Sequence, residues 1–310
     1  MKAIVFGGSG FLGSHVADVL TDRGFSVKIF DIRKSLYLQK NQKMIIGDIL
    51  DEEAVNNAVE GCDVVYNFAA MSDIDEAHRK PVETIKKNIL GNTYILEACR
   101  KHNVKRFVFA STIYVYSDKG SFYRSSKQAC ELIIENYNEV FNLPYTILRY
   151  GSLYGPRAQD TNWIRKILKQ ALTEGKITRY GDGEEIREYI HVKDAARLSV
   201  DILDEKYKNS IVMITGNNPM KIKDLHLMIK EILKNKIELE YLPAVSNTHY
   251  EITPYTFAPK MAKKIVSNEY YDLGQGILEC LYEIKKEIDY DLGQGILECL
   301  YEVKKRYNKK

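Results

Sequence analysis

The first half of the chain alternates short apolar runs with longer amphipathic stretches. It opens with the apolar run KAIVFG and the helical pattern FLGSHVADVLTDRG. The apolar runs SVKIFD, MIIGD, DVVYNFAA and RFVFAS follow, together with the helical stretches DEEAVNNAVEG and Glu83 to His102. Strands and helices in this order pair the strands in parallel through right-handed crossovers. The pattern therefore predicts an α/β protein with a doubly wound parallel sheet and helices on both faces.

The regular alternation ends near residue 155. A helix is predicted around Lys169, a GDGEE turn follows, and prolines interrupt the stretch from Leu242 to Pro259. Such turn-rich segments after a nucleotide-binding half are where a substrate cap is expected. We predict a dinucleotide-binding domain over residues 1–154, to which 190–215 return, and a smaller substrate-binding domain over 155–189 and 216–310.

A 19-residue sequence is repeated in tandem at the carboxyl end. YDLGQGILECLYEIKKEID begins at Tyr271, and YDLGQGILECLYEVKKRYN begins at Tyr290. Repeat folds need about three units to bury a continuous face, so two copies do not predict a solenoid. We interpret residues 271–310 as a duplicated terminal helix whose second copy lies outside the core. A dimerisation helix is the alternative.

Length and composition fit a soluble globular protein of two parts. The 310 residues are 45% hydrophobic and 28% charged, which allows a sizeable core. The net charge of +3 is small and much of the excess lies in the terminal KKRYNKK, which favours a solvated tail over a nucleic-acid arm. No apolar run approaches the roughly 18 residues of a membrane span. We expect neither a nucleic acid nor a membrane as partner.

The cysteines indicate a reducing compartment. They are widely spaced, without a Cys-x-x-Cys motif or a nearby histidine pair, which favours free thiols and argues against a metal site. The first predicted strand begins at Lys2, which leaves no room for a signal peptide. The sequence therefore predicts a cytoplasmic protein. The five cysteines are Cys62, Cys99, Cys130, Cys280 and Cys299.

Three glycines follow the first predicted strand at a spacing of three residues: Gly7, Gly10 and Gly13. At a strand-to-helix turn, glycines let the backbone turn tightly, approach a pyrophosphate and pack the helix on the sheet. Unpaired N–H groups at the helix start then attract the phosphate charge. The motif predicts a dinucleotide site, with a merely structural turn as the alternative.

Residues at the ends of the next strands fit the same ligand. Asp31 ends SVKIFD, where its carboxylate can accept hydrogen bonds from both ribose hydroxyls and would repel a 2′-phosphate. This favours NAD over NADP, although Arg33 partly offsets the repulsion. Asp48 is placed to bind the adenine amino group, with an exposed loop carboxylate as the alternative. The small residues of NFAA, 67–70, let a cofactor lie close to the backbone.

Tyr123 and Lys127 stand four residues apart on a predicted helix, after Thr112 at the end of RFVFAS. Positions i and i+4 share a helix face, so Lys127 is expected beside the Tyr123 phenol. Its ammonium, with a positive nicotinamide ring, is expected to lower the phenol pKa from about 10 toward working pH. Tyr123 then serves as a general base. The spacing is common by chance among 22 tyrosines, and its position after the fifth strand is what indicates catalysis.

Together these motifs resemble the extended short-chain dehydrogenase/reductases of the nucleotide-sugar epimerase/dehydratase kind, from Gly7 through TILRYGSLYGPR and REYIHVKDAA to about Ile284. The resemblance implies a Rossmann-type sheet, NAD as cofactor, a nucleotide-sugar substrate, and a homodimer through the helix of Tyr123 and the helix before it. It assigns catalysis to Thr112, Tyr123 and Lys127. It assigns the cofactor site to Gly7, Gly10, Phe11, Leu12, Gly13, Asp31, Asp48, Ile49, Phe68, Ala69, Ala70, Asn88, Tyr123, Lys127 and Tyr150.

Departures from the family bear on the reaction. The family's 4,6-dehydratases carry an Asp-Glu pair directly after the catalytic Thr, where this chain has Ile113 and Tyr114. The carboxylate of related decarboxylases and the Cys of 3,5-epimerases are also missing, so what remains resembles a 4-epimerase. Ser152 stands where UDP-galactose 4-epimerases usually have an Asn, and Arg124 replaces a glycine.

The resemblance places substrate binding at Ser152, Asn162 and Arg187. Arg187 matches an arginine that clamps the nucleotide diphosphate, for which a planar bidentate donor is suited, with a surface salt bridge as the alternative. Asn162 and Trp163 either line the nucleotide site or only pack. His191 is interpreted as a structural residue at the start of a helix.

The leading hypothesis is a UDP-hexose 4-epimerase that inverts C4 through a transient 4-keto sugar. A nucleotide-sugar 4-ketoreductase or a C2 epimerase uses the same three catalytic residues and stays open. A non-catalytic NAD-sensing regulator is disfavoured because Tyr123 and Lys127 are both present.

Overall fold

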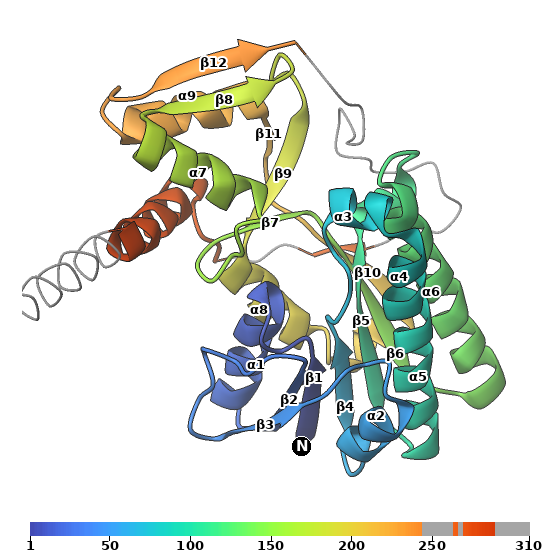
Figure 1. Cartoon of the computed structure of the whole chain (residues 1–310). Helices are drawn as coiled ribbons and strands as arrows, with labels where there is room; N and C mark the ends of the chain where they lie inside the picture. Colours follow the sequence, from blue (N-terminus) through green and yellow to red (C-terminus); the bar gives the residue numbers. More distant parts are fainter. Residues whose placement is uncertain (244–262, 266–268, 289–310) are drawn as a thin grey trace, which may run out of the picture.

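The centre of the protein is an eight-stranded parallel sheet (Figure 1). The computed structural model describes residues 1–243, 263–265 and 269–288. All neighbouring strands of this sheet pair in parallel, which confirms the predicted doubly wound architecture. The strand order is β13 (Lys263–Lys264), β10 (Ser210–Ile214), β6 (Tyr145–Tyr150), β5 (Arg106–Thr112), β4 (Val64–Asn67), β1 (Lys2–Phe6), β2 (Ser26–Asp31) and β3 (Gln42–Ile46).

Helices cover both faces of the sheet, and each face has its own buried apolar cluster. On one face lie α1 (Phe11–Asp22) and α8 (Val192–Asp201), which bury Leu20 and Ala195 in the first cluster. On the other lie α2 (Glu52–Val59), α5 (Gly91–Lys101) and α6 (Ser121–Phe141), which form the second cluster. Val5 of β1 enters the first cluster and its neighbour Ile4 the second, as the two-residue period of a strand requires.

The stretch predicted as one helix from Glu83 to His102 is interrupted. It begins as α4 (Pro81–Ile85), continues through a π-helical turn (Lys86–Leu90), and ends as α5. The short α3 (Ile74–Arg79) precedes it. Pro81 occupies the first turn of α4, where its missing N–H costs nothing. Single π turns inside helices often mark functional positions, and this one carries Asn88.

The remaining elements form a smaller part around a third apolar cluster. A three-stranded sheet has the order β11 (Pro219–Lys221), β9 (Ile186–His191) and β7 (Ser152–Tyr154), and β8 (Lys176–Tyr180) pairs with β12 (Glu238–Leu242). The third cluster is formed by residues of α7 (Trp163–Glu174), α9 (Ile222–Ile232) and the helical residues 273–288, with those of the small strands. Short 3-10 turns cover Ile113–Tyr116 and Glu205–Tyr207.

Capping residues in the sequence set several helix boundaries. The Asp51 carboxylate accepts the Ala54 N–H at 3.0 Å and starts α2, and Asn162 accepts the Arg165 N–H at 3.2 Å and starts α7. Both arrangements satisfy a backbone donor that the helix leaves open. Helix α7 ends at Gly175, whose φ of +68° is the left-handed conformation common at helix ends.

Two elements distant in the sequence complete the large sheet and its helical cover. Strand β10 pairs with β6, and α8 packs beside α1. The Tyr66 hydroxyl of β4 donates to the Ser199 carbonyl of α8 at 3.0 Å. Residues in the range 190–215 thus lie against the first part of the chain. The division into two domains at residues 154 and 155 stays a prediction.

The first copy of the terminal repeat packs on the fold. Residues 273–288 are helical and bury four side chains in the third cluster. The second copy, residues 290–308, lies outside the described residues, and Cys299 with it. The four buried side chains are Ile277, Cys280, Leu281 and Ile284. The described cysteines, Cys62, Cys99, Cys130 and Cys280, are all free and buried.

Candidate active site

The predicted cofactor and catalytic residues gather at the carboxyl ends of the parallel strands. Gly7 follows β1, Asp31 ends β2, Thr112 ends β5 and Tyr150 ends β6. Because these strands all run in one direction, their carboxyl ends meet at one edge of the sheet. The strand order also reverses between β1 and β4, and open α/β sheets bind ligands at such a switch point.

The turn between β1 and α1 is shaped for close backbone contacts. Gly7 has a φ of +76°, which glycine adopts without a steric cost. A Cβ on Gly13 would lie 2.3 Å from the Gly7 carbonyl oxygen, so only glycine lets α1 come this near. Gly10 precedes α1 without a side-chain cap, which leaves the first N–H groups of the helix open to phosphate oxygens. The turn therefore fits a dinucleotide pyrophosphate.

The segment after β4 lies against this turn. A Cβ on Gly7 would lie 2.7 Å from the Ala69 nitrogen and 2.8 Å from the Phe68 carbonyl carbon. The Phe68 ring stacks on Tyr66 with the ring centroids 5.9 Å apart, and its centroid is 6.4 Å from that of Tyr150. Phe68, Ala69 and Tyr150 are thus spatial neighbours around the glycine turn, with Ala70 next in the chain.

Three other predicted cofactor residues have side chains that pack in or against the apolar clusters of the large sheet. Phe11 is half-buried against the first cluster and Leu12 is buried within it, while Ile49 is buried in the second cluster. Phe11 and Leu12 begin α1, where the first N–H groups have no intrahelical partner. A cofactor contact by Phe11 and Leu12 stays a prediction, and these open backbone N–H groups are the donors that it would use.

Asp31 is tied to the glycine turn by backbone hydrogen bonds. Its Oδ2 accepts the Ser9 N–H at 3.1 Å and its Oδ1 the Arg33 N–H at 3.2 Å, which orients the carboxylate at the tip of β2. Arg33 itself is exposed. Asp48 is also exposed and accepts the Leu50 N–H at 2.9 Å.

Asn88 connects the segment after β4 to α6. Its Oδ1 accepts the Met71 N–H at 2.7 Å, and its Nδ2 donates to the Met71 carbonyl at 3.1 Å and to Ser126 Oγ at 2.9 Å. These bonds position α6, which carries Tyr123. A cofactor contact by Asn88 stays a prediction.

The Tyr123 phenol meets Thr112 at the end of β5. Their side chains hydrogen bond, and Thr112 Oγ1 also accepts the Tyr114 N–H at 3.2 Å. Since a hydroxyl has a single proton, Thr112 can take this N–H and still donate to the phenol oxygen. The Tyr114 ring stands edge-on to the Tyr123 ring, with the centroids 6.4 Å apart.

The protein alone moves the pKa of Tyr123 upward, opposite to the direction expected from the sequence. Burial raises the pKa of Tyr123 to about 12, and the Thr112 hydrogen bond lowers it only in part. Lys127 Nζ lies 5.9 Å from the Tyr123 ring centroid and donates to the Ala110 carbonyl at 2.6 Å. The positive nicotinamide ring remains as the source of the predicted decrease.

Lys127 is a buried cation, with an exposed fraction of 4%. Its Nζ lies 4.6 Å from the Phe109 ring centroid. Burial lowers the pKa of Lys127 to about 8, and nearby Cys130 and Glu131 oppose that decrease. An ammonium has three N–H donors. The bond to Ala110 uses one of them and leaves two for oxygen atoms of a ligand.

A buried ion pair beside Lys127 is the main feature that the sequence analysis missed. Glu131 Oε2 lies 2.5 Å from Arg149 Nη2, and both side chains are less than 10% exposed. Glu131 also accepts the Ser111 hydroxyl at 2.5 Å. The pair joins α6 to β5 and β6 and so fixes the position of Lys127. The usable signal is the spacing, because Glu131 lies four residues after Lys127 on the same helix face.

Two of the predicted substrate residues lie in neighbouring strands of the small sheet. Ser152 of β7 pairs with Tyr189 of β9. Arg187, two residues earlier in β9, projects from the same face as Tyr189 because side chains alternate along a strand. Arg187 is buried, and its Nη1 donates to the Ile186 carbonyl at 3.0 Å. The small sheet therefore brings Ser152 and Arg187 to one face.

Asn162 and Trp163 have structural partners. The Asn162 carboxamide caps α7 and donates from Nδ2 to the Leu153 carbonyl at 2.9 Å. The Trp163 ring stacks on Tyr189 with the centroids 6.4 Å apart. These contacts support the packing alternative for both residues, and a substrate contact by Asn162 stays a prediction.

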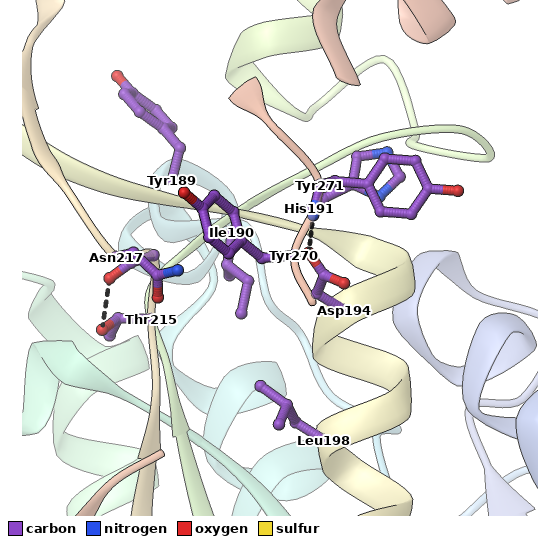
Figure 2. A pocket seen from close by; sticks show the side chains of 10 residues that line it. Tyr189, Ile190, His191, Asp194, Leu198, Thr215, Asn217, Tyr270 and Tyr271 are labelled. Atoms are coloured by element: carbon purple, nitrogen blue, oxygen red, sulfur yellow. Dashed lines mark hydrogen bonds between the residues drawn. The ribbon is translucent and has the colours of Figure 1, made fainter. Parts of the chain in front are cut away.

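A pocket lies where β9 meets the start of α8 (Figure 2). Its volume of about 30 Å³ is enough for a water molecule and too small for a nucleotide sugar. His191 caps α8 here by accepting the Lys193 N–H, which agrees with its interpretation as a structural residue. The pocket contains none of the predicted catalytic residues. Its lining includes Tyr189, His191, Asp194, Thr215, Tyr270 and Tyr271.

Comparison with known families agrees with this geometry. The sequence model of the NAD dependent epimerase/dehydratase family matches residues 3–214, more than half of the chain. The chain belongs to this family. Its cofactor is NAD, which the glycine turn and the oriented Asp31 carboxylate fit. When bound, NAD supplies a hydride acceptor and donor.

Members of the NAD-dependent epimerase/dehydratase family with several activities are similar to the chain. A UDP-N-acetyl-alpha-D-glucosaminuronate decarboxylase from Bacillus cytotoxicus is 31% identical over 78% of this chain and 83% of its own. A UDP-glucose 4-epimerase from Corynebacterium glutamicum is 28% identical over 78% and 84%. The structure of a UDP-glucose 4-epimerase from Thermotoga maritima with UDP-glucose superposes with a TM-score of 0.82 at 26% identity, covering 93% of this chain and all of that one.

Two classes of feature are missing from the described residues. Within residues 1–243, 263–265 and 269–288, no three His, Cys, Asp or Glu side chains are grouped to hold a metal ion. Among the helices that the structure describes, none is long and apolar enough to cross a membrane.

The first prediction concerns the Asp31 carboxylate. We expect the protein to bind NAD more tightly than NADP, because the carboxylate would repel a 2′-phosphate. Asp31→Ala should reduce this preference by about tenfold, the loss expected for one charged hydrogen-bond acceptor. Arg33→Ala, the matched change, should increase it. Calorimetric titration with both cofactors measures the ratio, and equal or tighter NADP binding by the unchanged protein would contradict the prediction.

Proposed function

We propose that the protein is a nucleotide-sugar 4-epimerase acting on a UDP-hexose. The observation that carries this proposal is the pair of residues after Thr112. Ile113 is buried and apolar, and Tyr114 packs its ring against Tyr123. Neither supplies the carboxyl group that elimination of water needs as acid and base. Proton transfer at one hydroxyl is the chemistry that Thr112, Tyr123 and Lys127 support.

In the proposed reaction Tyr123 removes the proton of the C4 hydroxyl. Thr112 donates its single hydroxyl proton to the Tyr123 phenol oxygen and limits its movement. The Lys127 ammonium stabilises the phenolate and holds ribose hydroxyls through its two remaining N–H donors. Loss of the C4 hydride, for which NAD would supply the acceptor, would give a 4-keto sugar. After the sugar turns over, the hydride would return to the other face of C4 and Tyr123 would return the proton. The net redox change is zero.

The relatives support this assignment but include other reactions. Two of the three similar proteins are 4-epimerases by name, and one is a decarboxylase of a UDP-uronate. A 4-ketoreductase or a C2 epimerase would use the same three catalytic residues. The hydrogen-bonded hydroxyls of Thr112 and Tyr123 and the buried Lys127 ammonium form a proton-transfer site. A non-catalytic sensor of NAD does not need such a site, so this alternative is disfavoured.

We propose that the small sheet holds the nucleotide diphosphate. Arg187 supplies a planar cation that can bind two phosphate oxygens, and Ser152 supplies a hydroxyl from the adjacent strand. Ser152 has a shorter reach than the Asn usual in UDP-galactose 4-epimerases. UDP recognition therefore depends more on Arg187.

We further propose a homodimer through the outer faces of α4 and α6. These helices pack beside each other on one side of the large sheet (Figure 1). These two helices and the π-helical turn Lys86–Leu90 expose several large apolar side chains, and exposed apolar surface can mark a protein–protein contact. These are Val82, Ile85, Leu90, Leu132, Val140 and Phe141.

The dimer is tested by Leu132→Glu, which should weaken association by placing a charge in the interface. Leu227→Glu on α9 is the matched control, because Leu227 is 50% exposed and Leu132 56%. Light scattering across a micromolar concentration series should show a dimer for the unchanged protein and the control, and a monomer for Leu132→Glu. A monomeric unchanged protein would contradict the proposal.

The function is tested with a panel of UDP-, GDP-, CDP- and dTDP-hexoses that also contains UDP-glucuronate. We expect NMR to show inversion at C4 of a UDP-hexose. The nicotinamide absorbance should show no net change. Release of carbon dioxide from the uronate, loss of water, or net oxidation of added NADH would instead identify a decarboxylase, a dehydratase or a ketoreductase.

The role of Tyr123 gives a sharper prediction. Tyr123→Phe removes only the phenol oxygen, so turnover should fall by about 10² to 10⁴ while NAD binding is kept. Lys127→Ala should decrease turnover and also weaken NAD binding. Tyr94→Phe, on α5, is a control that should keep full turnover. If Tyr123→Phe retained more than about a tenth of the epimerisation rate, Tyr123 would not be the base.

The Thr112 hydrogen bond predicts a change in pH dependence. The base acts as phenolate, so activity is present above its pKa and is lost as pH falls through it. The Thr112 hydrogen bond lowers the pKa of Tyr123. Thr112→Val should therefore move the acidic limb of the kcat profile to higher pH, whereas Thr112→Ser should leave this limb in place. The kcat profile against pH measures both, and an unmoved limb in Thr112→Val would argue against the bond.

A further inference from the structure

The helix of the first repeat copy fits closely against the smaller part of the protein, beside α7 (Figure 1). Its side chains Ile277, Cys280, Leu281 and Ile284 are each at most 6% exposed. At Gly276 the backbone comes so near that a Cβ there would lie 2.6 Å from the hydroxyl of Tyr154 and 2.9 Å from His191 Cδ2. We call the surface that receives this helix, formed by α7, β7, β9 and the start of α8, the terminal-helix surface.

Polar contacts fix the register of the helix on this surface. The Tyr271 N–H donates to Asp194 Oδ2 at 2.7 Å (Figure 2), and the Tyr271 ring stacks on His191 with the centroids 4.2 Å apart. Glu279 lies 3.1 Å from His191 Nε2 and pairs with Lys193. One turn later, Glu283 accepts the Arg157 N–H at 3.0 Å.

The second copy repeats every residue that makes these contacts except one. The copies are identical at their first thirteen positions, YDLGQGILECLYE, and at the two lysines that follow the next position. The exception is Val303, which stands where the first copy has Ile284. The equivalents in the second copy are Tyr290, Gly295, Ile296, Glu298, Cys299, Leu300 and Glu302.

We propose that the terminal-helix surface can accept the second copy in place of the first, so that the two copies compete for one position within the chain. This goes beyond the proposed function and does not depend on it. The occupant is residues 290–308 of the same chain. Because the copies adjoin without a linker, the second is present at the high effective concentration of an intramolecular ligand, which favours it over the same segment of another molecule.

The differences between the copies indicate which one binds better. Val303 lacks a methylene group that Ile284 buries. Arg306 stands where Glu287 forms an ion pair with Arg165, the atoms being 2.6 Å apart, and would place two cations together. When the second copy docks, the first copy becomes part of a loop. The entropic cost of closing this loop rises only slowly with its length, so it disfavours the second copy only slightly. The first copy is therefore preferred, and the second remains an accessible alternative.

Cysteine labelling tests the competition, because each copy carries one cysteine at the same position of the repeated sequence. Burial raises the pKa of Cys280 to about 12, which makes the docked thiol unreactive. Trypsin separates the two thiols, in peptides 265–285 and 287–304. In the unchanged protein we expect Cys299 to react with iodoacetamide at least about tenfold faster than Cys280, as a buried thiolate is suppressed.

Leu281→Glu should reverse this order. A carboxylate at this buried position disfavours docking of the first copy, so the second should take its place, protecting Cys299 and exposing Cys280. Leu300→Glu is the matched control and should leave Cys280 protected. In the double variant both thiols should react rapidly. If Leu281→Glu alone left Cys299 reactive, or unfolded the protein as fully as the double variant, the proposal would be wrong.

A milder variant tests the same idea without burying a charge. Exchanging Ile284 with Val303 and Glu287 with Arg306 gives each copy two of the other's distinguishing residues and leaves the half-buried Ile288, replaced by Tyr307 in the second copy, in place. The exchange should decrease the rate ratio of Cys299 to Cys280 by about threefold or more, as expected for one ion pair and one methylene. An unchanged ratio would contradict the competition. Protection of Cys299 in Leu281→Glu that disappears on dilution would show docking between molecules and overturn the intramolecular proposal.

Discussion

The site at the carboxyl edge depends on how closely three backbone segments approach one another after β1. A side chain at Gly13 would strike the Gly7 carbonyl, and one at Gly7 would strike the backbone of Phe68 and Ala69. The contact sets the distance of α1 from the sheet and of β1 from the segment after β4. It therefore determines where the first N–H groups of α1 point, and Ser9 of the same turn orients the Asp31 carboxylate.

Burial sets the electrostatics of the catalytic residues in a way that makes them dependent on the cofactor. It raises the pKa of Tyr123 and lowers that of Lys127 to about 8, so the protein alone keeps the phenol neutral while Lys127 stays largely an ammonium near neutral pH. The Glu131 carboxylate and the Arg149 guanidinium form an ion pair beside Lys127. This pair holds Lys127 in place, and because its own charges are balanced it does not cancel the charge of Lys127. A cationic ring next to Tyr123 would favour the phenolate, which couples formation of the base to loading of the cofactor.

Much of the fold was predictable because its signals are local. The glycine spacing, the apolar runs and the i, i+4 spacing of Tyr123 and Lys127 each occupy one short stretch of sequence. What could not be predicted depends on partners distant in the chain. The π turn at Asn88 involves Met71 and Ser126, the buried Glu131 pairs with Arg149, and the direction of the Tyr123 pKa shift follows from burial. Asn162 also illustrates that a residue matched to a binding role can serve as a helix cap.

The large sheet is completed from a late part of the sequence. Strand β6 ends at Tyr150 and its neighbour β10 begins at Ser210, with the first elements of the smaller part between them. At about 5 to 20 residues per second on the ribosome, roughly sixty residues take about 3 to 12 seconds to synthesise. During that interval β6 is an open strand edge, which invites pairing with other chains, and the face of α1 that receives α8 is bare. A nascent chain of this protein therefore passes through a period in which protection by chaperones matters more than its final stability suggests.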